Sequence, residues 1–259
     1  MTAISDRIYS KLSRVARRVG YELQGVSDIH TFAGNPRDIP QAERVATPMH
    51  KAFYENNGAM VHKWRGYLDH YHQHLSRFIG SPVRVLEIGV SKGGSLQMWR
   101  RYFGPSAVIF GIDIDPTCKQ YDGVAGSVRI GSQDDTVFLN QVVAEMGGVD
   151  VVIDDGSHVA RHQRKSFDVL FPKIDPNGVY ICEDTHTAYW RGPYEGGHGR
   201  KTNILEIAKK LIDDIHAEFH AKPISIERAN RTIKGIHFYN SMFVVEKAPQ
   251  PPSSHLQVS

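Results

Sequence analysis

Five short apolar runs, separated by segments of helical length, constrain the fold of this chain more than any other feature of its sequence. The runs are VRVLEIGV, AVIFGIDID, SVRIGS, VDVVIDDG and GVYICEDT, at residues 83–90, 107–115, 127–132, 149–156 and 178–185. They are rich in Val and Ile and lack the polar alternation of a half-exposed strand, which indicates parallel strands covered on both faces. Between them lie SLQMWRRYFG, DTVFLNQVVAEMG and RHQRKSFDVLFPKI, each long enough for a crossover helix. This alternation predicts a doubly wound α/β sheet.

The flanking segments predict two more strands and a helical cap. Residues 223–247 are typical of two strands around a turn, which would complete a Rossmann-like, seven-stranded sheet. We therefore predict a small N-terminal helical cap at residues 1–80, the sheet domain at 81–247 and a disordered tail at 248–259. Apolar spacing within the cap predicts helices over residues 1–20 and 61–79, with a loop at 32–50.

Composition and charge narrow the class of protein. Cys118 and Cys182 show no spacing of a zinc site or a disulfide framework, which favours a reduced, cytoplasmic protein. The formal net charge of +3 is too small to indicate nucleic-acid binding. The sequence contains no apolar window of about 18 residues, which a membrane span would need. Its N-terminal segment also lacks the uninterrupted apolar core that is typical of a signal peptide. The basic amphipathic pattern of residues 1–20 favours a packed helix, with attachment to anionic lipid as the alternative. The sequence leaves open whether the protein forms a homo-oligomer.

The predicted helix at residues 61–79 contains three histidines, His70, His72 and His74. A histidine pair spaced four residues apart can bind a transition metal. Because no third ligand is visible nearby in the sequence, we interpret these histidines as part of a solvated polar face.

The first three strand ends predict a nucleoside-type cofactor site. Ligands of open α/β sheets bind beyond the carboxyl ends of the strands. The first run ends in EIGVSKGGS, a glycine-rich turn that lets backbone approach a ligand. The turn does not follow G-x-G-x-x-G, and an acidic residue beside it would repel phosphate. A cationic ligand without phosphates, S-adenosylmethionine (SAM), fits better. The candidate cofactor residues are Glu87, Gly89, Gly93, Ser95, Asp113 for the ribose, Ser132, Gln133 or Asp134 for adenine, and Asp154.

The next two strand ends predict a metal site. Asp155 follows the fourth run, and Glu183 and Asp184 follow the fifth. Neighbouring strands would bring these carboxylates together, an arrangement that is costly unless positive charge offsets it. Oxygen ligands favour Mg²⁺, Mn²⁺ or Ca²⁺ over zinc, and Mg²⁺ or Mn²⁺ is the predicted metal. The alternative is that these acids are helix caps and solvated loop residues.

A histidine beside a metal suits the methylation of oxygen. A hydroxyl is a poor nucleophile until its proton leaves, and a divalent cation makes that loss easier. His158, three residues beyond Asp155, is the candidate base that takes this proton, the alternative being an ordinary loop histidine.

The segment VVIDDGSHVARHQRKSFDVLFPKIDPNGVYICEDTHTAYW resembles the metal-dependent sugar O-methyltransferases that modify the deoxysugars of macrolide antibiotics. The wider group includes cephalosporin hydroxylase-like proteins and rhamnosyl and mannosyl O-methyltransferases. The resemblance spans residues 83–247. It implies a SAM-dependent methyltransferase domain in which Asp155, Glu183 and Asp184 hold Mg²⁺ and His158 is the general base. It also places Tyr189 and Trp190, together with His186, beside the acceptor sugar.

The sequence therefore predicts a SAM-dependent O-methyltransferase acting on a sugar hydroxyl of a glycoside, oligosaccharide or polysaccharide precursor. One alternative is an O-methyltransferase of a catechol-like diol. A second is a non-catalytic SAM-binding module, and a nicotinamide-dependent oxidoreductase is a third. Comparing activity on a glycoside with activity on a catechol separates the sugar O-methyltransferase from the catechol O-methyltransferase.

Overall fold

The computed structural model describes residues 38–221 and 232–258 of the chain. The described residues from 41 onward belong to one compact unit. The helix predicted over residues 1–20 lies outside the described residues. The boundaries of the three predicted parts remain predictions.

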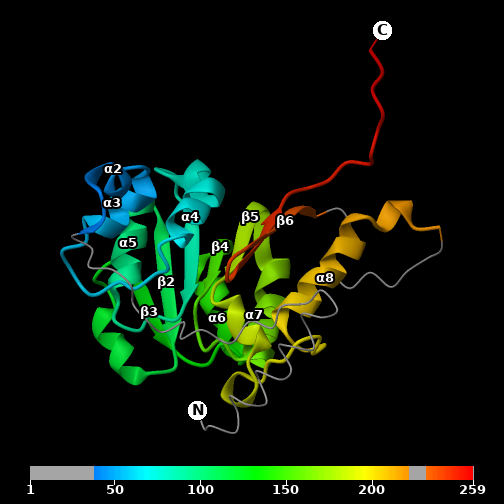
Figure 1. The fold of residues 1–259 in the computed structure, drawn as a ribbon. Coiled ribbons are helices and arrows are strands. Elements are labelled where there is room, and N and C mark those ends of the chain that lie inside the picture. Colours follow the sequence, from blue (N-terminus) through cyan, green and yellow to red (C-terminus); the bar gives the residue numbers. More distant parts are fainter. Residues whose placement is uncertain (1–37, 222–231, 259) are drawn as a thin grey trace, which may run out of the picture. The chain divides into compact units, whose positions relative to one another are not determined.

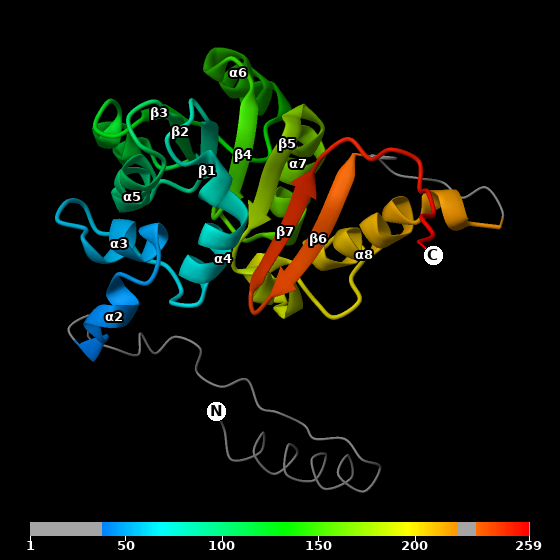
Figure 2. The same cartoon turned by 90° about the horizontal axis from the view of Figure 1, so that it is seen from above.

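A seven-stranded sheet with the strand order β3-β2-β1-β4-β5-β7-β6 forms the centre of this unit (Figure 2). The strands are β1 (Arg84–Ile88), β2 (Val108–Asp113), β3 (Ser127–Ile130), β4 (Val149–Asp154), β5 (Ile174–Cys182), β6 (Ile233–Tyr239) and β7 (Met242–Lys247). β1 to β5 are parallel, whereas β7 pairs antiparallel with both β5 and β6. The predicted Rossmann-like sheet, including its closing hairpin, is confirmed.

Helices cover both faces of the sheet (Figure 1). They are α3 (Pro48–Tyr54), α4 (Tyr67–Leu75), α5 (Gly94–Phe103), α6 (Thr136–Met146), α7 (Ala160–Leu170) and α8 (Ile204–Ile215), and the short helix α2 (Gln41–Arg44) precedes them without burying a side chain. Successive strand residues point to opposite faces, so Val85 and Val151 pack with α3, α4 and α5, while Leu86 and Val152 pack with α6, α7 and α8. This two-sided burial explains why the strands lack polar alternation.

Local sequence sets where the crossover helices begin and end. Asp135 caps α6, because its side chain accepts hydrogen bonds from the backbone N–H of Val137 and Phe138 at 2.9 and 3.1 Å. Gly147 ends that helix with a φ of 77°, a backbone conformation that favours glycine. Asn203 caps α8 in the same way through the N–H of Glu206. The predicted crossover helices are therefore present.

Short 3₁₀ turns connect several of these elements. They are η2 (Ser76–Phe78), η3 (Pro116–Tyr121), η4 (Phe171–Lys173), η5 (Thr185–Tyr189), η6 (Gly192–Tyr194) and η7 (Ala217–Phe219). Residues 248–258 form neither helix nor strand and are largely exposed. None of the helices in residues 38–221 and 232–258 has the length and apolar character needed to span a membrane.

The cap region differs from its prediction in two places. The segment predicted as a loop, residues 32–50, contains α2 and the start of α3, which Thr47 caps and Pro48 opens. The helix predicted over residues 61–79 begins only at Tyr67. Residues 61–64 are neither helical nor paired in a strand, and the side chains of Lys63 and Trp64 reach the carboxylates described below.

Candidate active site

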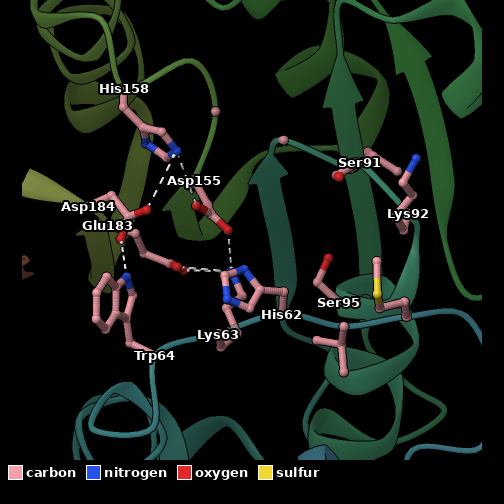
Figure 3. A pocket seen from close by; sticks show the side chains of 16 residues that line it. His62, Lys63, Trp64, Ser91, Lys92, Ser95, Asp155, His158, Glu183 and Asp184 are labelled. Carbon is pink, nitrogen blue, oxygen red and sulfur yellow. Dashed lines mark hydrogen bonds and ion pairs between the residues drawn. The ribbon is translucent and has the colours of Figure 1, made fainter. Parts of the chain in front are cut away.

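A cavity of about 260 Å³ opens at the carboxyl ends of β1, β4 and β5. Four segments contribute to its wall, from residues 60–64, 89–95, 155–158 and 183–184 (Figure 3). The parallel strands thus bring the predicted cofactor turn and the predicted acidic residues to one place. Residues 60–64 are an addition that the sequence did not indicate.

The backbone is strained at three side-chain-bearing residues that line this cavity. Ser91, His158 and Asp184 have φ angles of 48°, 55° and 52°. Positive φ values are uncommon for residues other than glycine and cluster at functional sites. The cavity is therefore the best candidate for an active site in the described part of the chain.

The glycine-rich turn is held by carboxylates on two sides. Asp113 accepts hydrogen bonds from the N–H groups of Val90 and Ser91, both at 2.9 Å. Glu87 is fully buried beneath the turn, where it accepts hydrogen bonds from Ser95 Oγ at 2.7 Å and Trp99 Nε1 at 2.9 Å. Burial raises the pKa of the Glu87 carboxyl, and Lys63 opposes that shift. Both acids shape the turn from the protein side.

The backbone angle of Gly89 and its close approach to a neighbouring carbonyl can be tested by substitution. Its φ is +98°, and a Cβ there would overlap the backbone carbonyl of Asp155. We expect Gly89→Ala to lower the free energy of unfolding by more than about 2 kcal/mol, since strain and overlap add. The matched control is Gly80→Ala, because Gly80 has a φ of +76° but open space around its Cβ position. Equal losses for the two variants in denaturant unfolding would show that Gly89 needs only its backbone angle.

Gln133 and Asp154 form a buried network that supports the loop after β4. Gln133 Nε2 donates to Asp154 Oδ1 at 3.1 Å and to Ser166 Oγ at 2.8 Å, and its oxygen accepts from the N–H of Ser157 at 2.8 Å. Tyr180 donates to the other oxygen of Asp154 at 2.8 Å. Burial raises the pKa of the Asp154 carboxyl, whereas Tyr180 lowers it. Both side chains are engaged within the protein, so their predicted cofactor contact stays a prediction.

The two other residues predicted near adenine lie closer to the surface. Ser132 donates to Asp134 Oδ1 at 2.6 Å, and Asp134 Oδ2 lies 3.3 Å from His162 Nε2. The Ser132 hydrogen bond, assisted by His162, holds the pKa of Asp134 below its usual value although burial opposes it. Neither residue is among those that line the cavity.

Lys63 is the positive centre of the acidic cluster. Its Nζ donates to Asp155 Oδ2 at 2.6 Å and to both oxygens of Glu183 at 2.9 and 3.0 Å, and lies 3.7 Å from Glu87 Oε1. Burial alone would lower the pKa of Lys63, but the three carboxylates raise it far above its usual value. Lys63 therefore remains charged and offsets part of the repulsion among these acids.

Glu183 is turned away from Asp184. It is fully buried and also accepts a hydrogen bond from Tyr71 at 2.5 Å. Burial and Asp155 raise the pKa of the Glu183 carboxyl, while Lys63 and Tyr71 oppose them. Asp184 follows the end of β5 with a φ of 52°, and its side chain instead accepts a hydrogen bond from Trp64 Nε1 at 2.8 Å.

His158 faces two of the predicted metal ligands. Its Nε2 lies 3.8 Å from Asp155 Oδ1 and 3.7 Å from Asp184 Oδ2 (Figure 3). One ligand atom from each of these three residues lies within 4.8 Å of the others, a spacing that a metal ion can bridge. The Nδ1 atom of His158 is buried and makes no hydrogen bond. The structure thus groups His158, and not Glu183, with the two aspartates.

Two of the three residues predicted beside the acceptor, His186 and Trp190, form an aromatic group with Trp64, which lines this cavity. His186 lies edge-to-face against Trp64 and Trp190, with ring centroids 5.9 and 4.7 Å away. His186 Nδ1 is also hydrogen-bonded to Ser241 Oγ. Tyr189 is 56% exposed and stacks near His198, away from this group.

Sequence reasoning missed the contribution of Lys63, Trp64, Tyr67 and Tyr71. Tyr67 donates a hydrogen bond to Asp184 Oδ1 at 2.8 Å, as Tyr71 does to Glu183. Helical periodicity places Trp64 and Tyr71 on a packing stripe, and nothing local in the sequence marks Lys63 as buried or Tyr67 as a partner of an acid. The one available signal was the excess of acids at converging strand ends, which requires a nearby cation.

A family model described as a methyltransferase domain matches residues 86–185. This part of the chain is a methyltransferase domain. The resemblance to sugar O-methyltransferases is confirmed by curated relatives. L-olivosyl-oleandolide 3-O-methyltransferase of Streptomyces antibioticus is 39% identical over 196 residues, covering 69% of this chain and 50% of the relative. Mycinamicin VI 2''-O-methyltransferase of Micromonospora griseorubida is 39% identical over 191 residues, covering 69% and 47%.

A solved structure shares the fold of the methyltransferase domain. The MycE methyltransferase of the mycinamycin pathway, in complex with Mg, SAH and mycinamycin VI, is 34% identical with a TM-score of 0.70. The match covers 78% of this chain and 54% of that one. The chain therefore spans about half the length of the curated relatives it matches.

Proposed function

We propose that this methyltransferase transfers the methyl group of SAM to a sugar hydroxyl, assisted by Mg²⁺ or Mn²⁺. The observation that carries the proposal is the meeting of His158 Nε2 with Asp155 and Asp184, at 3.8 and 3.7 Å, beside the glycine-rich turn. The activities named for the relatives support a sugar-containing acceptor, and the Mg and SAH bound to MycE support the cofactors.

The turn at residues 89–95 is the proposed seat of the methionine part of SAM. Gly89, Ser91 and Ser95 line the cavity, and the backbone there approaches without side-chain obstruction. Asp113 lies behind the turn, where its carboxylate accepts hydrogen bonds from the N–H groups of Val90 and Ser91, and we keep it as the proposed partner of the ribose hydroxyls. The sulfonium charge of SAM suits a cavity whose far wall carries Asp155 and Asp184.

The acidic residues partly fit a divalent cation. Asp155 and Asp184 offer oxygens that converge with His158, whereas Glu183 accepts hydrogen bonds from Lys63 on both oxygens. We keep all three acids as proposed ligands, with Glu183 the one whose role most needs a direct test. A bound cation would make a coordinated hydroxyl more acidic and orient it.

His158 is the proposed general base. Its neutral imidazole takes the hydroxyl proton at Nε2 as the O–H bond breaks. The oxygen then attacks the methyl carbon, so a new O–C bond forms while the S–C bond breaks and its electron pair stays on sulfur. The products are the methyl ether, S-adenosylhomocysteine and a proton on His158.

Aromatic side chains beside the cavity support a sugar as the acceptor. Trp64 is 40% exposed, and its indole N–H is anchored to Asp184. With His186 and Trp190 it presents ring surfaces of the kind that pack on the C–H faces of a pyranose. We propose these three residues, and Tyr189 further out, as the acceptor side, open to a glycoside or an oligosaccharide or polysaccharide precursor.

Isotope-labelled SAM tests the acceptor class. The protein, labelled SAM and Mg²⁺ are incubated in parallel with deoxysugar glycosides, rhamnosyl and mannosyl oligosaccharides, and a catechol. Label in the glycosides supports the proposal, and label only in the catechol replaces the sugar with a phenolic diol. If SAM stabilises the protein thermally but no acceptor in the panel is labelled, a binding module without methyl transfer becomes the better reading.

Metal removal gives a separate prediction. Treating the active protein with a chelator should lower turnover by at least about 100-fold, because a neutral hydroxyl is then harder to deprotonate. Adding Mg²⁺ or Mn²⁺ back should restore turnover, and Ca²⁺ serves as the control for simple charge screening. Full activity in the chelated protein would rule out metal assistance.

A further inference from the structure

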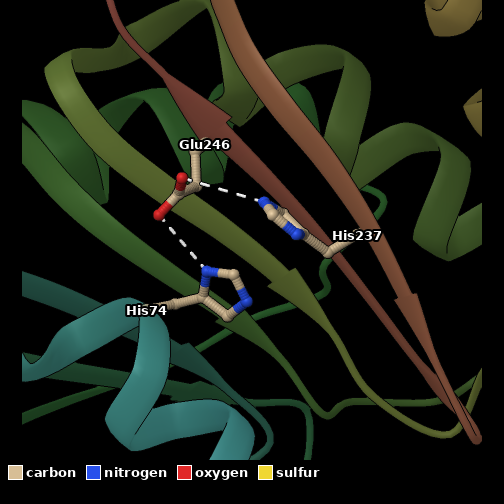
Figure 4. A group of neighbouring side chains, drawn as sticks. All are labelled: His74, His237 and Glu246. Atoms are coloured by element: carbon tan, nitrogen blue, oxygen red, sulfur yellow. Dashed lines mark hydrogen bonds and ion pairs between the residues drawn. The ribbon is translucent and has the colours of Figure 1, made fainter.

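A second group of metal-ligating side chains lies apart from the cavity, between α4 and the β6–β7 hairpin (Figure 4). His74 comes from α4, His237 from β6 and Glu246 from β7. The sequence placed His74 on a solvated face, and this interpretation is wrong, because His74 is 2% exposed. The missing third ligand is supplied by residues more than 160 positions away.

The geometry of this group approaches that of a transition-metal site. His74 Nδ1 lies 3.2 Å from Glu246 Oε1, and His237 Nε2 lies 3.8 Å from Glu246 Oε2. One ligand atom from each residue falls within 4.8 Å of the others. Ligand atoms on one tetrahedral Zn²⁺ ion are separated by about 3 to 4 Å, so small side-chain rotations suffice.

Two features distinguish the group from an ordinary hydrogen-bonded cluster. His237 Nε2 is buried and makes no hydrogen bond, although it faces Glu246. The second nitrogen of His74, Nε2, is bonded to Tyr239 OH at 2.8 Å, which orients the ring so that Nδ1 faces the carboxylate. Metal-ligating histidines are commonly oriented by a partner on their other nitrogen.

The charged groups around Glu246 define what such a site must overcome. Arg77 Nη1 lies 3.0 Å from Oε1, and Lys234 Nζ lies 3.6 Å from Oε2. Lys234 is 58% exposed and can move away, but it competes with a cation for the same oxygen. Two imidazoles beside one carboxylate favour Zn²⁺ and similar ions over Mg²⁺.

We propose that His74, His237 and Glu246 form a structural site for a transition-metal cation of the Zn²⁺ type, which fastens α4 to the β6–β7 hairpin. The same helix contributes Tyr67 and Tyr71, whose hydroxyls bond Asp184 and Glu183. A metal at this site would therefore hold in place the helix that supports the acids of the candidate active site.

Zinc binding to the metal-stripped full chain tests the proposal. We expect calorimetry to detect Zn²⁺ binding, and we expect bound Zn²⁺ to raise the melting temperature. His237→Ala should weaken Zn²⁺ binding by more than about 100-fold. His237→Asn, a polar substitution, should show the same loss if His237→Ala folds poorly. Lys234→Met should tighten binding, because it removes the competing ammonium.

Two variants of other histidines serve as controls. His72→Ala alters the same helix, but His72 is paired with Tyr102 at 3.1 Å and lies outside the group, so its zinc response should match the wild type. His158→Asn tests the cavity as the source of binding and should leave the zinc binding that depends on His237 unchanged. The proposal is overturned if wild-type protein shows no zinc response, if His237→Ala and His237→Asn keep it, or if His158→Asn abolishes it.

Discussion

Replacing His158 with asparagine should lower turnover by about 10²- to 10⁴-fold, the range that a general base contributes, and leave SAM affinity nearly unchanged. His158 Nε2 faces the cavity between Asp155 and Asp184, and asparagine cannot take a proton there. Asparagine is preferred to alanine because residue 158 has a φ of 55°, which asparagine tolerates better than other non-glycine residues. The measurements are methyl transfer under saturating SAM and the dissociation constant for SAM.

The same variant separates two roles for this imidazole. The distances also allow His158 to be a metal ligand together with the two aspartates. If His158 acts as a base, the dissociation constant of His158→Asn for Mg²⁺ should stay within about threefold of the wild-type value. If His158 is a ligand, the variant should bind the metal at least about 10-fold more weakly. Near-normal turnover in His158→Asn would remove the residue from both roles.

Replacing Lys63 with methionine should destabilise the metal-free protein by about 3 to 5 kcal/mol, the cost of removing one partner of a buried ion pair. Lys63 is the buried cation that contacts Asp155 and Glu183 and lies near Glu87. Without it, the buried carboxylates of Glu87 and Glu183 and the partly exposed Asp155 repel one another. Methionine keeps much of the volume of the side chain and removes its charge together with its hydrogen bonds to Asp155 and Glu183, so unfolding in denaturant reports the loss of the ion pairs.

Divalent cation should rescue part of this loss. Adding Mg²⁺ should stabilise Lys63→Met more than the wild type, because in the described part of the chain Lys63 is the lysine or arginine that pairs with these acids. The matched control is Lys92→Met, since Lys92 also lines the cavity but is exposed. Its stability should stay within about 0.5 kcal/mol of the wild type. Equal stability of all three proteins without metal would contradict the role assigned to Lys63.

Several features of the fold were predictable because they depend on local patterns. Apolar runs without polar alternation predicted β1 to β5, and Asp135 and Gly147 mark the ends of α6 by ordinary capping chemistry. The N-terminal region was predicted less well. The segment at residues 61–64 follows helical periodicity, but contacts with distant acids hold it out of a helix.

The candidate site likewise has one part that the sequence predicts and another that only the tertiary structure shows. The sequence alone determined that Asp155, His158, Glu183 and Asp184 follow two strands whose carboxyl ends meet, because parallel strands in a doubly wound sheet align their ends. Only the tertiary structure decided how these side chains face one another. Glu183 turns to Lys63 and Tyr71, Asp184 turns to Trp64 and Tyr67, and Gln133 joins Asp154 below the loop.

The same holds for His74, which the sequence presented as one of three helix-surface histidines and the structure joins to His237 and Glu246. The physical reason is the range of the interactions. Strand and helix patterns arise from burial and backbone geometry within about ten residues, which the sequence displays directly. Charge compensation and ligand grouping depend on which distant side chains share a buried volume, and the packing of the chain alone settles that.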